Sequence, residues 1–278
     1  MVDILKSITF IGENGSILEK DRISIILNGT NPSQDAVLDF IQLQNSDGGF
    51  PFGMIQGNIS TINETTVAMW WMEELDLLSS TTAEMAYTYL LSKQMEDGGW
   101  DEDQQIVQFD LPPWMQPGDL KTRLYLSAYA AYWLAVGGYQ ATPAFRKAIH
   151  FLLRHQEPSG RVYGYLHNTW IASGVFLMAG DRYTKMASLG IQSLAGIPLS
   201  EWDDSQIAWA VDCLSRGGLP KKHPFIETCL DQLFHRQKAD GSWASEDGEG
   251  SAVGATIQVL KVMKRYGLLI SGRESSTG

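Results

Sequence analysis

The chain of 278 residues is long enough to bury a substantial core in one large domain or two small ones. Its 21 Lys+Arg against 32 Asp+Glu give a net charge of −11, which argues against a polyanionic partner such as nucleic acid. Cys213 and Cys229 form no CxxC pair, so neither a disulfide framework nor a thiolate-rich metal site is predicted, and a cytoplasmic protein fits best. No signal peptide and no transmembrane segment is predicted.

Apolar residues recur at helical spacing along the chain and predict alternating helices of two kinds. The first kind is amphipathic with a charged face, and the second is small and aromatic with few charges, which is typical of helices inside a fold. The expected outer helices are 33–44, 82–94, 142–156, 182–194 and 224–237. The expected inner helices are 65–78, 120–136, 168–179, 203–215 and 251–266, and a further pair is expected at 2–10 and 17–28.

One phrase, Q-x-x-D-G-x-[FW], recurs where the outer helices are expected to end. It begins at Gln44, Gln94 and Gln237, with a weaker copy at Gln156. An apolar residue four positions earlier shares a helical face with each Gln, and the following Gly can adopt the positive φ that ends a helix. We expect the closing aromatic residue to fold back over the helix end and to contact the Gln side chain.

Five or six helical hairpins of this kind can close into a ring. A linear array would need polar caps at both ends, and the sequence shows none. We therefore predict an all-α fold, a single α/α toroid of alternating inner and outer helices around a central cavity. The predicted domain spans 1–273, and 274–278 is expected to be a frayed tail.

The repeat resembles that of the squalene-hopene and oxidosqualene cyclases, in which an apolar residue, Gln, Gly and an aromatic residue follow the same spacing. Looser forms occur in the β subunits of protein prenyltransferases and in the helical domains of class II diterpene cyclases. The resemblance covers about 40–266 and implies the α/α toroid. In these cyclases the Gln and aromatic side chains tie neighbouring helices together. The resemblance implies this structural role for Gln44, Gln94, Gln237, Trp100 and Trp243.

The segment 201–205, Glu-Trp-Asp-Asp-Ser, resembles the D-x-D-D-T signature with which these cyclases protonate an alkene or an epoxide. The resemblance implies Asp203 as the proton donor, tuned by Glu201 and Asp204, because crowded carboxyl groups cannot all ionise and one stays protonated. The alternative is structural. Ser200 followed by Asp203 also fits a capping box, with acidic residues in the first turn of a helix.

Aromatic residues on the expected inner helices can line a cavity and stabilise a carbocation, although core packing is the alternative for each of them. The predicted substrate-binding residues are Trp202, Trp209, Trp170, Tyr129 and Trp70, with Trp114 from the long apolar segment 101–118, which is either a lid or a loop tucked onto the rim. Arg123 is a candidate for binding a diphosphate, or else a solvated charge. His167 is a candidate base or orienter of the acid, beside a helix-capping Asn.

No cofactor is predicted. The zinc ligands of the prenyltransferases are not reproduced, because Asp212 and Cys213 are adjacent rather than two residues apart. Magnesium is possible if the substrate is a diphosphate. We predict a class II terpene cyclase-like enzyme that protonates a polyprenyl or other isoprenoid substrate; the alternative is a non-catalytic toroid that binds an apolar ligand or a protein. Full squalene cyclases have two toroids, so a homodimer or a partner toroid could complete the cavity.

Overall fold

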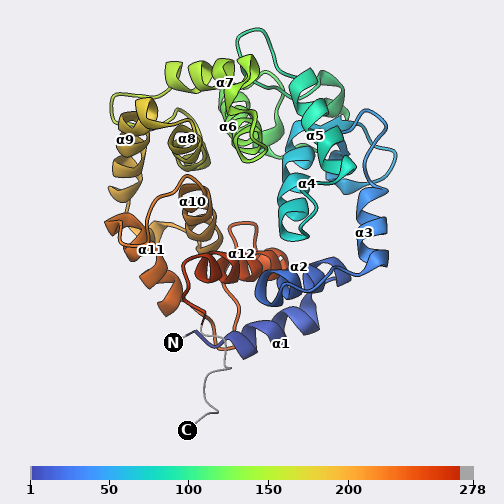
Figure 1. Ribbon diagram of the computed structural model, residues 1–278, viewed down its shortest axis with the longest axis vertical. Coiled ribbons are helices and arrows are strands. Elements are labelled where there is room, and N and C mark those ends of the chain that lie inside the picture. Colours follow the sequence, from blue (N-terminus) through green and yellow to red (C-terminus); the bar gives the residue numbers. More distant parts are fainter. Residues whose placement is uncertain (1, 270–278) are drawn as a thin grey trace. The chain divides into compact units, whose positions relative to one another are not determined.

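The structure, a computed structural model, describes residues 2–269. These residues contain twelve α-helices, coloured along the chain in Figure 1, and one pair of two-residue strands. Within the described part, unit 1 comprises 2–32, 198–212 and 220–269, and unit 2 comprises 33–197 and 213–219. The prediction of one domain over 1–273 stays a prediction, and the predicted tail at 274–278 lies outside the described residues.

Unit 2 is built from helices that pack in two rows. Three predicted inner helices form one row, in which α4 packs against α6 and α6 against α8. The second row consists of outer helices: α5 packs on α4, α7 on α6 and α9 on α8 (Figure 1). The helices are α3 (Gln34–Ile41), α4 (Ile62–Glu74), α5 (Thr81–Ser92), α6 (Leu120–Val136), α7 (Pro143–Arg154), α8 (Leu166–Met178) and α9 (Thr184–Ala195). Short 3-10 helices are η1 (Phe52–Met54), η2 (Gln104–Gln108), η3 (Pro113–Met115), η4 (Tyr139–Ala141) and η5 (Asp181–Tyr183). Strands β1 (Phe50–Pro51) and β2 (Ser60–Thr61) pair antiparallel, with Phe50 opposite Thr61.

Unit 1 gathers segments from both ends of the described chain. Its helix α12 packs against α1 and α2, which come from the first thirty residues. The elements are α1 (Ile4–Asn14), α2 (Ile17–Asn28), η6 (Leu199–Glu201), α11 (Pro224–His235), η7 (Glu249–Ser251) and α12 (Ala252–Arg265). Helix α10 (Asp204–Arg216) begins in unit 1, and its residues from 213 onward belong to unit 2.

Burial separates the two kinds of helix in the way that the sequence predicts. Every residue from 124 to 135 of α6 is buried, whereas α7 buries one face only, formed by Phe145, Ala148, Ile149, Phe151 and Leu152. A helix that is buried all round needs few charged residues, and a helix buried on one face keeps them on the other. The predicted all-α class and the alternation of the helices are therefore confirmed.

In each copy of the repeat, the Gln side chain joins the end of one outer helix to the start of another. Gln94 donates from Nε2 to the carbonyl oxygen of Gly98 in its own turn, at 3.0 Å, and to that of Ala144 in the first turn of α7, at 2.9 Å. The Gln amide thereby joins its own turn to the first turn of the next outer helix. The same two bonds recur in the other copies, from Gln44 to Gly48 and Thr82, from Gln156 to Gly160 and Met186, and from Gln237 to Gly241 and Asp3. The predicted fastening role is confirmed.

The aromatic residue of the repeat has a different partner from the one expected. The indole N–H of Trp100 donates to the carbonyl oxygen of Leu90 at 2.7 Å, and that of Trp243 donates to Leu233 at 2.8 Å. Each acceptor is the apolar residue four positions before the Gln. The hydrogen bond of the indole therefore goes to the last turn of its own helix and not to the Gln side chain, whose amide donates to main-chain carbonyl groups.

Candidate functional site

The predicted acid cluster at 201–204 occupies two environments in unit 1. Glu201 and Asp203 are exposed, whereas Asp204, the first residue of α10, is only 4% exposed. The structure therefore does not gather the three carboxyl groups in one apolar environment. The assignment of Asp203 as the donor rests on the sequence pattern alone and stays a prediction.

Asp204 is held by a cation and by the main chain. Its Oδ1 lies 3.3 Å from Nη1 of Arg236, and its Oδ2 accepts the N–H of Ala244 at 2.9 Å. The same guanidinium group donates to the carbonyl oxygens of Trp202, at 2.7 Å, and Leu199, at 2.6 Å. Asp204 thus joins the start of α10 to the end of α11 and to the segment that follows Trp243.

The capping box expected at Ser200 lies three residues too early. Ser200 belongs to the 3-10 helix η6, and α10 begins only at Asp204. The main-chain N–H of Asp203 instead donates to Oε1 of Gln206 at 3.1 Å, which is the reciprocal bond of a capping box one turn further on. The expected cap was wrong because a short 3-10 turn separates Ser200 from the helix.

A second group of acidic residues, in unit 2, includes a buried carboxyl that the sequence pattern did not single out. Glu102 is 5% exposed and lies at the start of α4, where Oε2 accepts the N–H of Ile62 and Oε1 that of Asn63, each at 2.9 Å. Burial raises the pKa of Glu102 to about 8; the two N–H bonds oppose this rise, and the nearby charges of Glu64 and Asp101 add to it. Burial therefore favours the protonated form of Glu102.

Glu64 and Asn63 complete the polar surroundings of Glu102. Glu64 is hydrogen-bonded to the hydroxyl group of Thr61 and accepts the N–H of Gly53 at 3.1 Å. The carbonyl oxygen Oδ1 of the Asn63 side chain is buried and has no hydrogen-bond partner among residues 2–269. The run Asp-Glu-Asp at 101–103, directly after the aromatic residue of the repeat, is the sequence signal that could have pointed to this place.

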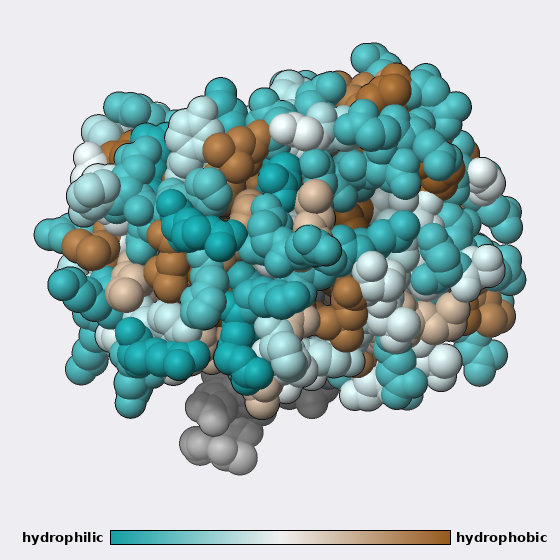
Figure 2. Space-filling view, turned by 90° about the horizontal axis from the view of Figure 1, so that it is seen from above, coloured by the Kyte–Doolittle hydropathy of each residue, from teal (hydrophilic) through white to brown (hydrophobic). Residues whose placement is uncertain are grey.

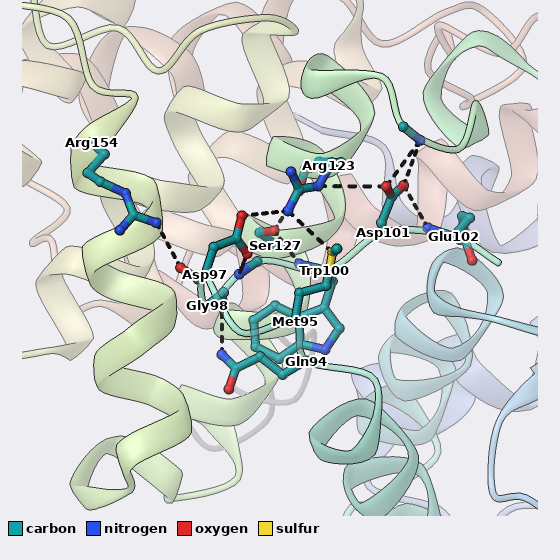
Figure 3. Close-up of polar contacts among 12 residues, drawn as sticks. Gln94, Met95, Asp97, Gly98, Trp100, Asp101, Glu102, Arg123, Ser127 and Arg154 are labelled. Atoms are coloured by element: carbon teal, nitrogen blue, oxygen red, sulfur yellow. Dashed lines mark hydrogen bonds and ion pairs between the residues drawn. The ribbon is translucent and has the colours of Figure 1, made fainter. Parts of the chain in front are cut away.

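Arg123 pairs with acidic side chains of the repeat turn (Figure 3). Its Nη2 lies 2.8 Å from Oδ2 of Asp97, its Nε lies 3.7 Å from Oδ2 of Asp101, and its guanidinium carbon lies 5.3 Å from the ring centre of Phe151. Burial alone would raise the pKa of Asp97, but the hydrogen bond and charge of Arg123 outweigh it and lower that pKa. The predicted role of Arg123 in binding a diphosphate stays a prediction, and it would compete with these ion pairs.

Three of the predicted substrate-binding and catalytic residues form a connected aromatic group on α6 and α8. The ring of His167 lies 4.3 Å from that of Trp170 and 6.3 Å from that of Tyr125, which in turn lies 6.0 Å from Tyr129. Tyr125, Tyr129 and Trp170 are buried, so this group is part of the packing between α6 and α8.

The other predicted aromatic residues have separate surroundings. Trp70 on α4 donates from Nε1 to Oε1 of Glu74 at 2.6 Å, and Trp114 on η3 is 39% exposed. Trp202 and Trp209 belong to unit 1, where the Trp202 ring lies 6.3 Å from that of Phe225. No described contact joins these four residues into one site.

The segment 101–118 is fixed to unit 2 at several points. Ile106 and Met115 are fully buried, and the carbonyl oxygen of Pro113 accepts hydrogen bonds from the hydroxyl groups of Thr122, at 3.1 Å, and Tyr165, at 3.0 Å. Of the two expected alternatives, these contacts favour a tucked segment over a free lid.

No helix in the described range is long and apolar enough to cross a membrane. The face shown in Figure 2 is largely hydrophilic, and its hydrophobic residues stand in separate small groups. Among residues 2–269, no three His, Cys, Asp or Glu side chains are placed to hold a metal ion together.

Comparison with known proteins gives a likeness in fold. No protein-family profile matches the chain, and no curated protein sequence matches it. Type II terpene cyclase MstE from Scytonema, in its apo form, superposes with a TM-score of 0.60 at 14% identity, over 91% of this chain and 89% of that one. ent-Copalyl diphosphate synthase from Streptomyces platensis gives a TM-score of 0.56 at 14% identity, over 90% of this chain and 50% of that one.

A protein from Actinoplanes has the same fold, with a TM-score of 0.63 at 14% identity over 95% of this chain and 98% of that one. Variants of MstE were also solved with geranylgeranyl dihydroxybenzoate as substrate and with merosterolic acid A as product. The chain therefore has a class II terpene cyclase-like fold, in agreement with the resemblance in its repeat.

Proposed function

We propose that the protein is a class II terpene cyclase-like enzyme that protonates an isoprenoid chain and cyclises it through carbocation intermediates. The likeness in fold to two such cyclases, over about nine-tenths of this chain, carries the proposal. The E-x-D-D pattern at 201–204 and the aromatic group on α6 and α8 add support.

The reaction needs an acid and a surface that tolerates cations. A carboxyl group gives its proton to one carbon of an alkene, whose π electrons form the new C–H bond, and a carboxylate and a carbocation result. A neighbouring alkene attacks the cation and closes a ring, and the last cation loses a proton. The net reaction is an isomerisation, and none of these steps consumes a cofactor. Magnesium would be required only to bind a diphosphate group.

In this proposal Asp203 is a proton donor, aided by Glu201 and Asp204, and His167 accepts the final proton. Because Asp203 is exposed, it can regain a proton from solvent after each turnover. The proposed substrate-binding residues are Trp202, Trp209, Trp170, Tyr129, Trp70, Trp114 and Arg123. A homodimer or a partner toroid that completes the substrate cavity is part of the same proposal, and the mass of the protein in solution tests the homodimer.

The test is turnover of defined substrates. Purified protein is incubated with squalene, farnesyl diphosphate, geranylgeranyl diphosphate and geranylgeranyl dihydroxybenzoate, and products are identified by mass spectrometry. We expect a cyclic product that is an isomer of its substrate, and a loss of about 10²-fold or more in Asp203→Asn. Asp181→Asn, another exposed aspartate, serves as the matched control and should retain activity.

Absence of product from every substrate would contradict the proposal. The alternative is then a non-catalytic toroid, and binding of the same compounds, measured by the shift in thermal unfolding, would support it.

A further inference from the structure

Glu102 is a carboxyl group at a position where the other copies of the repeat have none. It lies two residues after Trp100, the aromatic residue of its copy, and the same place in the other copies is taken by Phe52, Gly164 and Ser245. Those copies form the same turn and the same Gln bonds without a carboxyl group. The architecture of the repeat therefore does not account for Glu102.

Capping alone is also an incomplete explanation. Helix α4 already has a cap from its own chain, because the side chain of Thr61 accepts the N–H of Glu64. Glu102 satisfies two further N–H groups from a distant part of the sequence, at the cost of burying an ionisable group among other acidic residues. A buried amide or hydroxyl side chain could accept these bonds without that cost.

The groups that face Glu102 favour its neutral form. The titratable side chains that interact with it are Glu64 from α4, Tyr89 from α5 and Asp101 from its own segment. Of these three groups, Asp101 alone is paired with Arg123 of α6, at 3.7 Å. Two of the three are carboxyl groups, and burial excludes the water that would stabilise a charge on Glu102.

Beside this acid lies an acceptor that has no partner. Asn63, whose main-chain N–H contacts Glu102, is 8% exposed, and its side-chain oxygen Oδ1 is buried with no hydrogen bond within the described residues. Buried polar atoms in folded proteins are nearly always paired. A buried acceptor without a partner in the described residues, on the residue whose main-chain N–H bonds to Glu102, is a reason to expect a ligand or an ordered water there.

We propose that Glu102 is a catalytic acid of unit 2 that donates its proton to an alkene of the isoprenoid substrate. The inference rests on the proposed function and names an alternative donor for the one proton that starts the same reaction. The O–H proton moves to an alkene carbon, the π electrons form the C–H bond, and the carboxylate of Glu102 remains beside the new carbocation. The last cation of the cascade loses its proton to His167, and Glu102 takes up a proton from water before the next turnover.

The contacts of Glu102 suit the transition state better than the ground state. While the acid is neutral, the N–H groups of Ile62 and Asn63 bond to it only moderately. As negative charge develops, both bonds strengthen, and the positive end of the α4 dipole faces the same charge. These donors are fixed by the helix, so no reorganisation is needed when the proton leaves.

Activity of matched variants tests the inference. Glu102→Gln keeps the size of the side chain and removes the acid, and Glu96→Gln, an exposed glutamate of the same repeat, is the control. We expect Glu102→Gln to lose at least about 10²-fold in kcat and Glu96→Gln to match the wild type. The wild-type rate should fall above about pH 8, where Glu102 ionises, and the residual activity of Glu102→Gln should lack that limb.

Comparison with Asp203→Asn separates the two proposals. If Glu102→Gln stays within fivefold of the wild type while Asp203→Asn is inactive, the inference on Glu102 is wrong and the proposed function stands. If Glu102→Gln is inactive, circular dichroism and the midpoint of urea unfolding establish that it is folded, and Glu102→Asp should recover part of the activity.

A binding measurement tests Glu102 even without turnover. The probe is geranylgeranyl trimethylammonium, which mimics a carbocation and keeps its charge at every pH. Between pH 6.5 and 9 its affinity for the wild type should rise at least about tenfold as Glu102 ionises, whereas Glu102→Gln should show no such rise. An affinity that does not change with pH in the wild type, or that rises equally in Glu102→Gln, would overturn the inference.

Discussion

Asp204 and Glu102 are two buried carboxyl groups at the starts of predicted inner helices, and their neighbours give them opposite character. Both accept main-chain N–H groups, from Ala244 in one case and from the first residues of α4 in the other. Asp204 also has the guanidinium group of Arg236, whereas Glu102 lies among other acids. A buried carboxyl group at the start of a helix is therefore part of an ion pair in unit 1, whereas in unit 2 its surroundings favour the protonated form.

This difference shows that an acidic motif does not by itself identify a proton donor. The E-x-D-D pattern supplies the residue types, but its buried member is neutralised by a cation and its other two carboxyl groups are exposed. A buried carboxyl group keeps its proton only where no nearby cation stabilises the carboxylate. The surroundings that distinguish the two groups come from residues distant in sequence.

The largest change in the free energy of unfolding is expected when the guanidinium group of Arg236 is removed. Arg236→Met should lower the free energy of unfolding by about 4 kcal/mol at pH 7, because Asp204 would be left charged, buried and unpaired. Urea unfolding measures the change. Arg154→Met, which removes a more exposed guanidinium group bonded to the Asp97 carbonyl oxygen, is the control and should cost about 1 kcal/mol or less. A cost below 1 kcal/mol for Arg236→Met would show that Asp204 does not depend on the ion pair.

Glu102 should make stability depend on pH in the direction opposite to that of an ordinary carboxylate. Its pKa is raised from 4.5 to about 8 on folding, so between these values the folded protein holds a proton that the unfolded chain has released. Stability should therefore fall as pH rises from 5 to 8, by about 1 kcal/mol per pH unit, and level off above 8. Glu102→Gln should remove this slope in urea titrations at several pH values, and an unchanged slope would contradict the assigned protonation.

The Gln bonds allow the two units to be compared at equivalent positions. Gln237→Ala should cost about 2 kcal/mol, and Gln94→Ala about 1 kcal/mol, because Gln237 also accepts the N–H of Asp3 and donates to the hydroxyl of Ser7. Chemical denaturation measures both, with the exposed Gln104→Ala as a control near zero. Equal costs would mean that the additional bonds in unit 1 contribute no stability.

The smallest effect is expected at the exposed acids. Asp203→Asn and Glu201→Gln should each change the free energy of unfolding by less than about 0.5 kcal/mol, because neither side chain is buried. Thermal unfolding at pH 7 checks this. A large loss in Asp203→Asn would assign Asp203 a structural role at the start of α10, and any loss of activity in that variant would then have to be separated from instability.

Much of the fold could be predicted because its signals are local. The helix at 120–136 has the predicted bounds, since Asp119 caps it and the glycines at 137 and 138 follow it. The helix expected at 65–78 begins earlier, at Ile62, because Thr61 caps it and polar residues in the first turn had obscured the apolar pattern. Local periodicity and capping thus predict the helices to within a few residues.

The site could be predicted less well because it depends on contacts between distant segments. The sequence around residue 204 does not predict the ion pair with Arg236. The sequence around residue 102 does not predict the hydrogen bonds with the N–H groups of α4. The aromatic residue of the repeat was assigned the wrong partner for a related reason, since the carbonyl of Leu90 becomes available only where the helix ends. Burial and partner charge, which decide the state of an acid, are properties of the folded chain.

The bonds of Gln237 to the first helix set an order of events during protein synthesis. The amide of Gln237 and the main chain of Asp3 are 234 positions apart, and α1 also packs against α12. A ribosome that adds about 5–20 residues per second needs roughly 10 to 50 s to make the connecting chain. During that time α1 and α2 exist without α12 and Gln237, so their contacts with these residues can form only after 33–219, which include all of unit 2, have been synthesised.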